Sequence, residues 1–185
     1  MKSRGVLLED HSQILRALNV LEEMALRVQR WEEPNEKDVK GIVAFLKGFA
    51  DTHHQGREEL VLFGALLRDC GQKNYRELCS LIFEHNRQRS LIDGIANSMF
   101  TRKKNDFVYY ANHLVKILRM HLKEEDEVLL PLMELTFSPA DDDRVARDMK
   151  AYDRQWQDKE LPGLLRSLDK LESKYFRKGT VAKAG

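Results

Sequence analysis

Apolar residues recur with a helical period through the first part of the chain. Over residues 6–30 they fall three or four positions apart, at Leu7, Ile14, Leu15, Leu18, Leu21 and Ala25. This spacing places side chains on one face of an α-helix. Pro34 interrupts the pattern, and Asn35 can cap the segment that follows. We therefore expect a first helix over residues 6–30 and a second that starts near Asn35.

The same period continues through three more segments. We expect helices over about 35–68, 74–99 and 106–133, separated at Gly71 and at the charged stretch 101–105. Their apolar positions are Val39, Ile42, Val43, Leu46, Phe49, Leu60 and Phe63; then Leu78, Leu81, Ile82, Ile92, Ile95 and Met99; then Phe107, Tyr110, Ala111, Leu114, Ile117, Leu118, Val128 and Leu132. Strand-like alternation is almost absent. The pattern predicts an all-α protein, an antiparallel up-down-up-down four-helix bundle.

A helical extension is expected after this bundle. Ser138, Pro139 and the acidic residues behind them are typical of a helix start. Apolar side chains share one face there and continue past Pro162, at Val145, Met149, Tyr152, Trp156, Leu164, Leu165, Leu168 and Leu171. We expect residues 1–135 to form the bundle and 136–185 an extension with a disordered end. The extension would pack on the bundle or on a second subunit, so a homodimer through it is possible.

Composition narrows the class of protein. Charged residues make up 33% of the 185, and the formal net charge is only +1. That balance creates no strong field for nucleic acid or a membrane surface, and neither partner is expected. No apolar run approaches the ~20 residues of a membrane span, and the two cysteines indicate no disulfide framework. We expect a soluble cytoplasmic protein.

Two histidine–carboxylate pairs stand four residues apart, His54 with Glu58 and His121 with Glu125. A four-residue offset places both groups of a pair on one helix face. The second pair continues the apolar stripe of its helix, which points to the core. A buried carboxylate costs several kcal/mol unless something positive compensates it, and a metal ion would do so.

Two single histidines complete the pattern. His11 lies between apolar positions of the first helix, and His85 lies between those of the third. Each of the four helices thus brings one histidine to its inner face. Imidazole and carboxylate donors suit iron, manganese or zinc, and the lack of paired cysteine ligands argues against a thiolate site.

The second helix holds adjacent histidines, and two arguments disagree about them. Apolar periodicity places His53 nearer the centre of the inner face than His54. However, Arg57 stands four residues after His53, whereas Glu58 stands four residues after His54. The spacing argument selects His54, and His53 becomes a boundary residue or an outer neighbour of the site.

With these histidines and carboxylates on four successive helices, the chain resembles the hemerythrin-like, or HHE cation-binding, domains. The resemblance covers about residues 7–133 and lies in the segments LLEDHSQILRAL, FADTHHQGREELVLF, FEHNRQRSLI and HLKEEDEVLLPLM. It implies two non-haem iron ions, with manganese or zinc as alternatives. The ligands it implies are His11 and His54 for one metal, His85 and His121 for the other, and Glu58 and Glu125 as bridges. The best-known members bind dioxygen reversibly.

Arg89 departs from the oxygen-carrying members, which have another histidine at this position. Its guanidinium stays protonated and has no acceptor, so it cannot ligate a cation. Both metals would then keep an open position, which argues against simple oxygen carriage. Alternatively, Arg89 is a salt-bridged residue that pairs with Glu59 or with a carboxylate of the fourth helix.

Three functions remain compatible with the sequence. The first is a di-iron protein that binds or reacts with dioxygen, peroxide or nitric oxide, for sensing, scavenging or storage. The second is a di-iron enzyme that decomposes peroxide. The third is a regulatory module in which metal holds the bundle together and the extension contacts a partner through Val145, Met149, Tyr152 and Trp156.

Overall fold

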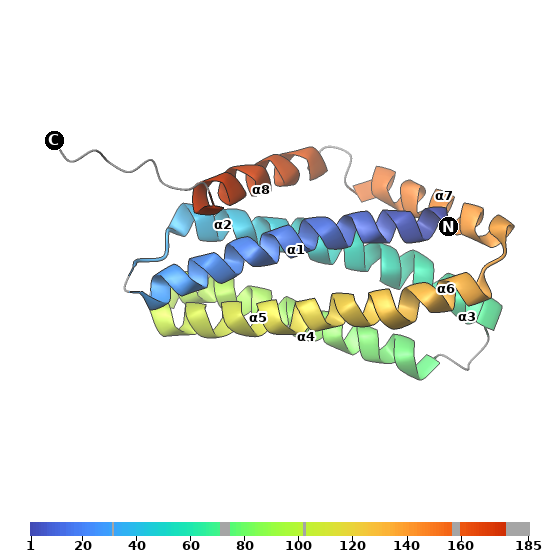
Figure 1. Cartoon of the computed structure of the whole chain (residues 1–185), viewed down its shortest axis with the longest axis horizontal. Helices are drawn as coiled ribbons and strands as arrows, with labels where there is room; N and C mark the ends of the chain where they lie inside the picture. Colours follow the sequence, from blue (N-terminus) through green and yellow to red (C-terminus); the bar gives the residue numbers. More distant parts are fainter. Residues whose placement is uncertain (31, 71–74, 102, 157–159, 177–185) are drawn as a thin grey trace.

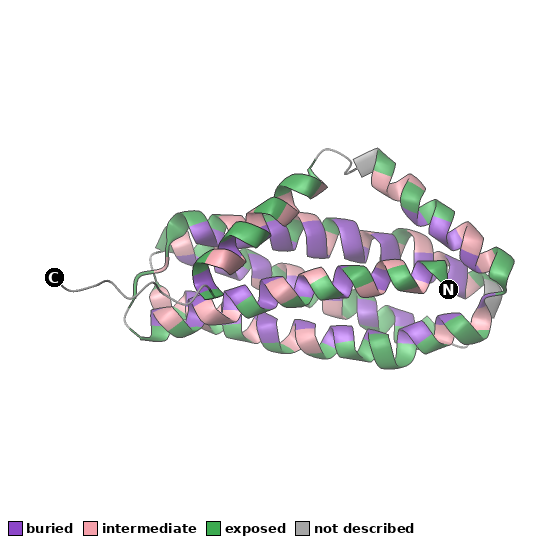
Figure 2. Ribbon diagram, turned by 45° about the horizontal axis from the view of Figure 1, so that its top comes forward, coloured by how far each residue is buried: buried purple, intermediate pink, exposed green. Residues whose placement is uncertain are grey.

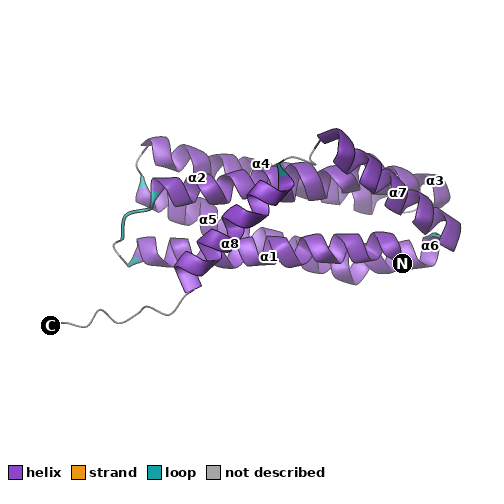
Figure 3. Cartoon of the chain, turned by 90° about the horizontal axis from the view of Figure 1, so that it is seen from above, coloured by secondary structure: helices purple, strands orange, loops and turns teal. Residues whose placement is uncertain are grey.

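The chain folds as an antiparallel helical bundle that is covered on one side by two further helices (Figure 1). The computed structural model describes residues 1–30, 32–70, 75–101, 103–156 and 160–176. These residues contain helices and no strands (Figure 3). The expected all-α bundle is confirmed. None of the described helices is long and apolar enough to cross a membrane.

Four long helical rods form the bundle. The first is α1 (Lys2–Gln29), and the third is α4 (Tyr75–Thr101). The second rod runs through α2 (Glu36–Phe45), the π-helical segments η1 (Leu46–Gln55) and η2 (Glu58–Leu62), and α3 (Phe63–Cys70). The fourth runs through α5 (Lys104–Glu124), the π-helical segment η4 (Glu125–Leu129) and α6 (Leu130–Thr136).

Local sequence explains where the helices begin. The side chain of Asn35 accepts a hydrogen bond from the backbone N–H of Asp38 at 3.1 Å, so Asn35 caps the second rod as predicted. Before the extension, Ser138 and Asp141 cap each other: Asp141 accepts from the Ser138 backbone N–H, and the Ser138 hydroxyl lies 3.3 Å from the Asp141 backbone nitrogen. Such a reciprocal pair satisfies backbone donors that the first helical turn leaves free.

The extension packs on the chain's own bundle. Helix α7 (Pro139–Trp156) lies against α1 and η2, and α8 (Leu161–Phe176) crosses over α1 and α2 (Figure 3). Val145 and Met149 are both only 1% exposed, so the apolar face of α7 is covered. The side chain of Trp156 and the end of the chain after residue 176 lie outside the described residues.

Buried residues, purple in Figure 2, line the inner faces of the bundle helices. They form two apolar clusters with a layer of buried polar residues between them. On α1, Leu7 belongs to one cluster and Ile14 to the other, and His11 lies between them. The same order recurs on the other three rods. The polar layer is therefore enclosed by hydrocarbon on both sides along the bundle axis.

Two residues expected in the core are exposed, and the π-helical segments explain both. Leu60 is 71% exposed and Val128 is 52% exposed. A π-helical turn holds one residue more than an α-turn, which shifts the following side chains by about 100°. The inner positions therefore pass to Leu62, which is fully buried, and to Leu129, which is 3% exposed.

Two further expectations fail more mildly. Leu15 and Ile82, at the edges of their apolar faces, are 39% and 37% exposed. The charged turn is also shorter than the expected 101–105, because Thr101 ends α4 and Lys104 begins α5.

Candidate metal centre

The polar layer brings together all six residues that the sequence singled out. They form two overlapping groups, one of His11, His54, Glu58 and Glu125, the other of Glu58, His85, His121 and Glu125. Within each group, one potential ligand atom per residue lies within 4.8 Å of every other. Both carboxylates belong to both groups. Such shared carboxylates are suited to a site for two neighbouring cations.

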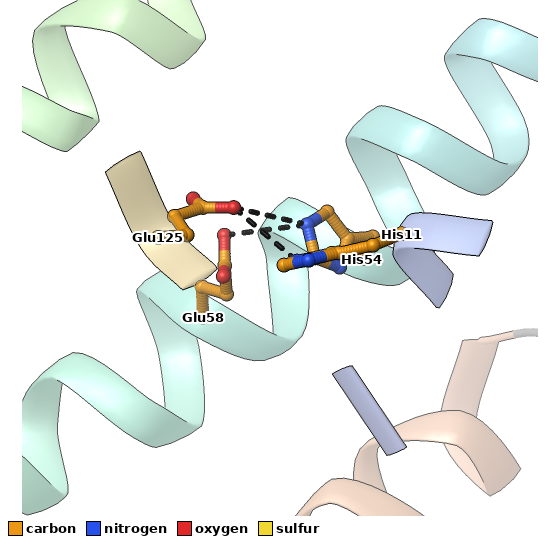
Figure 4. A group of neighbouring side chains, drawn as sticks. All are labelled: His11, His54, Glu58 and Glu125. Atoms are coloured by element: carbon orange, nitrogen blue, oxygen red, sulfur yellow. Dashed lines mark ion pairs between the residues drawn. The ribbon is translucent and has the colours of Figure 1, made fainter. Parts of the chain in front are cut away.

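Each rod of the bundle contributes to the layer. In the second rod, η1 turns the inner face progressively, so that His54 rather than His53 points to the centre. Figure 4 shows His11 and His54 converging on Glu58 and Glu125 from two different helices. The conflict between periodicity and spacing at residues 53 and 54 thus arises because that segment is not a regular α-helix.

Glu125 faces both groups at once. Its Oε2 lies 3.3 Å from Nε2 of His11 and 3.8 Å from Nε2 of His54. Its Oε1 lies 2.8 Å from Nε2 of His121 and 3.8 Å from Nε2 of His85. One oxygen therefore serves each histidine pair, which is the arrangement a bridging carboxylate requires.

The layer is closed to solvent and short of hydrogen bonds. Glu58 and Glu125 are both 0% exposed. Neither oxygen of Glu58 finds a hydrogen-bond partner among the described residues, and neither does Nε2 of His54. Nε2 of His85 and Nε2 of His121 face each other at 3.0 Å. Buried polar atoms without partners are costly, and cations between these donors would satisfy them. The residues therefore fit a pair of metal ions.

A carboxylate lies beside the outward Nδ1 of every histidine in the layer. The Nδ1 atoms of His85 and His121 lie 2.6 Å from Glu59 and 2.7 Å from Glu84. In the other group, Asp126 lies 2.8 Å from Nδ1 of His11, and Asp10 lies 3.5 Å from Nδ1 of His54. When Nδ1–H donates to a carboxylate, Nε2 keeps its lone pair for a metal. The rings of His11, His85 and His121 are thus oriented for ligation through Nε2, whereas Nδ1 of His54 lies near Asp10 but makes no hydrogen bond among the described residues.

The sequence contains a signal for these outer carboxylates that periodicity alone does not reveal. Each one is the immediate neighbour of a residue in the layer, in the pairs Asp10–His11, Glu58–Glu59, Glu84–His85 and Glu125–Asp126. Adjacent helical residues differ by about 100° in direction. The acid beside an inward residue therefore points along the interface and meets the histidine of a neighbouring helix.

Arg89 lies outside both groups. Its guanidinium donates to Glu59 at 2.8 Å and to Asp51 at 2.7 Å. Of the two alternatives, the ion pair with Glu59 is observed, and Asp51 of the second rod is a further partner. Arg89 thus supports the carboxylate that holds His85.

His53 is buried but belongs to neither group. Its two ring nitrogens lie 3.6 Å from Asp10 and 3.5 Å from Asp153. It therefore lies behind His54, beside the same outer carboxylate. His113, the remaining histidine, is partly exposed on α5.

Electrostatics set the two central carboxylates apart. Burial, reinforced by the neighbouring Glu125, raises the pKa of Glu58. Although burial acts in the same sense on Glu125, the imidazole of His121 and those of His11 and His54 hold its pKa well below the usual range. The two acids of this closed site therefore have pKa shifts of opposite direction. Positive charge between them would favour the ionised form of both.

A small cavity of about 130 Å³ reaches this layer between α4 and α5. His121 and its outer partner Glu84 line it, together with Gln88 and Met120. The space is suited to a few water molecules or a small diatomic or triatomic molecule, and too small for a large organic substrate.

Comparison with known protein families agrees with this geometry. No match is found among curated proteins or among solved structures. The family model described as the hemerythrin HHE cation binding domain matches residues 4–133. The matched region contains all six residues of the layer and ends before α7. The chain belongs to the hemerythrin HHE cation-binding domain family.

Proposed function

We propose that this chain is a non-haem di-iron protein that binds or reacts with dioxygen or a related small oxidant, for sensing, scavenging or storage. The observation that supports this most directly is the pair of buried His/Glu groups that share Glu58 and Glu125. His11 and His54 would hold one ion, His85 and His121 the other, and the two glutamates would bridge them.

The donor set supports iron. Imidazole and carboxylate ligands suit iron, with manganese and zinc as alternatives. Bound iron would supply the electrons for chemistry with oxygen. Each group offers four protein donors, which leaves positions for a small exogenous molecule in six-fold coordination. The cavity beside His121 gives such a molecule a route to the layer.

The chain's own residues orient the donors and exclude water. Hydrogen bonds to three outer carboxylates orient the rings of His11, His85 and His121, and Asp10 lies 3.5 Å from Nδ1 of His54. The two apolar clusters close the layer at both ends. A dry site with preset donors limits loss of the ions and side reactions with solvent.

Metal analysis combined with optical spectroscopy tests this function. Protein prepared with ferrous iron in the absence of air should hold two ions per chain and should change its absorption spectrum on aeration. A stoichiometry of at most one ion under iron-replete conditions would contradict the di-metal assignment. Two ions without any spectral response to dioxygen, peroxide or nitric oxide would contradict the proposed reactivity.

A di-iron enzyme that decomposes peroxide is the second candidate. It is favoured by Arg89, whose side chain pairs with Asp51 and Glu59, so that the His85 group has no further ligand from this position. Sustained peroxide consumption without loss of iron would identify an enzyme. Consumption of about one equivalent per site, followed by arrest, would favour binding or sensing.

The third function is a partner-binding module. Of the face expected to contact the partner, Val145 and Met149 are buried against the chain's own bundle, Tyr152 is half-buried, and the side chain of Trp156 lies outside the described residues. This function stays a prediction. A homodimer through the extension stays a prediction and would have to use other residues of α7 and α8. Sedimentation of the purified protein would test it.

A further inference from the structure

Helix α7 is connected to the metal centre by a chain of charged contacts. Asp153 of α7 accepts two hydrogen bonds from the Arg57 guanidinium, at 2.8 Å from Nε and 2.6 Å from Nη2. The remaining Arg57 nitrogen, Nη1, donates to Oδ2 of Asp10 at 2.6 Å. That same oxygen lies 3.5 Å from Nδ1 of His54. Three contacts therefore separate α7 from a residue of the central layer.

These charges are buried, so each depends on the others. Arg57 is 6% exposed and Asp10 is 4% exposed. An enclosed guanidinium needs a carboxylate partner, because water cannot replace one. His53 closes the ring, with one nitrogen 3.6 Å from Asp10 and the other 3.5 Å from Asp153. Among the described residues, Asp153 and Asp10 are the carboxylates that accept from Arg57. If Asp153 lost its charge, only Asp10 would remain.

The position of Asp153 is set by contacts next to it. The hydroxyl of Tyr152 donates to the backbone carbonyl of Thr52 in η1 at 2.6 Å. Gly56 leaves the space that the Tyr152 ring occupies, since a Cβ there would lie 2.1 Å from its hydroxyl oxygen. Met149, one turn earlier, is 1% exposed. Helix α7 is thus seated on the π-helical stretch that presents His54.

Among the described residues, no such chain of contacts connects the other three histidines to the extension. Their outer carboxylates are Asp126, Glu59 and Glu84, all within the residues that match the family. Asp10 also belongs to that region, but its partner Arg57 is held from α7, which lies beyond it. The two metal positions therefore differ: the one defined by His11 and His54 is connected to α7, and the one defined by His85 and His121 is held by residues of the matched region.

We propose that Asp153 is a positioning residue for the metal centre, which acts through Arg57 on Asp10 and so fixes the ring of His54. The extension would then affect metal affinity at the centre, in addition to covering one side of the bundle. This inference rests on the proposed function, because it concerns affinity at the position that His11 and His54 define. Without Asp153, the carboxylate of Asp10 would shift toward Arg57, and Nδ1 of His54 would lose the contact with Asp10.

Binding of ferrous iron to the metal-free full-length chain, measured without air against a competing chelator, tests this role. Loss of an outer-sphere partner typically weakens metal binding by about 10- to 100-fold. For Asp153→Asn, one step further out, we expect about a tenfold loss at one of the two binding events. Asp10→Asn should weaken the same event, whereas Glu84→Gln should weaken the other. Asp148→Asn, an exposed acid on the same helix, is the matched control.

The result separates positioning from simple stabilisation. Asp153→Asn is also expected to lower the melting temperature, because it breaks a partly buried ion pair, so affinity is measured on protein whose circular dichroism shows it folded. Two binding constants equal to those of Asp148→Asn would overturn the proposal. If Asp153→Asn does not fold, Asp153→Glu keeps the charge but displaces it, and unchanged affinity in that variant would overturn it equally. If the parent protein binds no metal, the proposed function itself fails, and that outcome is distinguishable from the others.

Discussion

Oε1 of Glu125 lies 2.8 Å from Nε2 of His121, and both side chains are buried. The two residues are one turn apart, yet they belong to different helical types, because α5 ends at Glu124 and η4 begins at Glu125. The contact joins the carboxylate shared by both groups to a histidine of one of them.

Glu125→Ala should weaken both metal positions. Glu125 directs one oxygen to each histidine pair. The fall in metal affinity should therefore exceed the roughly 10- to 100-fold fall that is typical of an outer-sphere change. Glu124→Ala, the exposed neighbour, is the control. Iron content per chain after desalting is the measurement. Equal iron content in the two variants would count against a shared carboxylate.

His54→Ala should empty or halve the site, while His53→Ala should largely retain both ions. Only His54 belongs to the central layer, and His53 lies behind it beside Asp10 and Asp153. The His53 variant should instead lose stability, since it leaves a buried polar cavity. Metal analysis and thermal unfolding on the same samples measure the two effects. Retention of both ions only in the His54 variant would reverse the assignment.

Glu59→Gln should weaken metal binding at the His85 position by about 10- to 100-fold, because a neutral amide supports the imidazole less well than a carboxylate. Although burial opposes ionisation, hydrogen bonds from His85 and Arg89 lower the pKa of Glu59. Arg89→Gln should therefore weaken binding in the same direction, by a smaller factor. Arg87→Gln, exposed on the same helix, is the control. If Arg89→Gln and Arg87→Gln bind iron equally, Arg89 has no role in supporting Glu59.

The metal-free protein should lose stability as pH rises from about 6.5 to 9. Burial opposes protonation of His121, but Glu125 prevails and raises its pKa from 6.5 to about 9. A raised pKa in the folded state stabilises the protein fully below the unfolded value, and this contribution disappears as pH passes the folded value. Its size is on the order of 3 kcal/mol.

Metal binding should show the opposite trend. A ligating imidazole must give up its proton, so apparent affinity should rise over the same pH range and binding should release protons. Melting temperatures of the metal-free protein, and calorimetry in two buffers that differ in ionisation enthalpy, measure these effects. A flat melting temperature between pH 6.5 and 9 would contradict the role assigned to His121.

Gly56→Ala should destabilise the protein by about 1–3 kcal/mol, because the new methyl group would overlap the Tyr152 ring. Gly64→Ala on the same rod is the matched control, since among the described residues only the end of Arg68 lies near a Cβ built there, at 3.8 Å. That control should be neutral or stabilising by up to about 1 kcal/mol, from helix propensity. Denaturant unfolding compares the two. Equal effects would show that α7 does not rest closely on residue 56.

Local sequence was sufficient for the helices and for the identity of the layer. A three- and four-residue apolar period defines each rod because one face of a helix must be buried in a bundle. Asn35 and Ser138 mark helix starts because their side chains satisfy free backbone N–H groups. The four-residue spacing of His121 and Glu125 places both on one helix face, whatever the rest of the chain does.

Only the tertiary structure decided which residues of each helix point to the core and which residues of neighbouring helices contact each other. Sequence periodicity assumes a constant 3.6 residues per turn, and the π-helical segments break that assumption between Leu46 and Leu62 and again after Glu124. This is why His54 belongs to the layer although apolar periodicity alone favoured His53, and why Leu129 is buried in place of Val128. The contact from Asp153 to Arg57 joins residues 96 positions apart, and no local pattern encodes it, because it exists only once α7 has packed on the second rod.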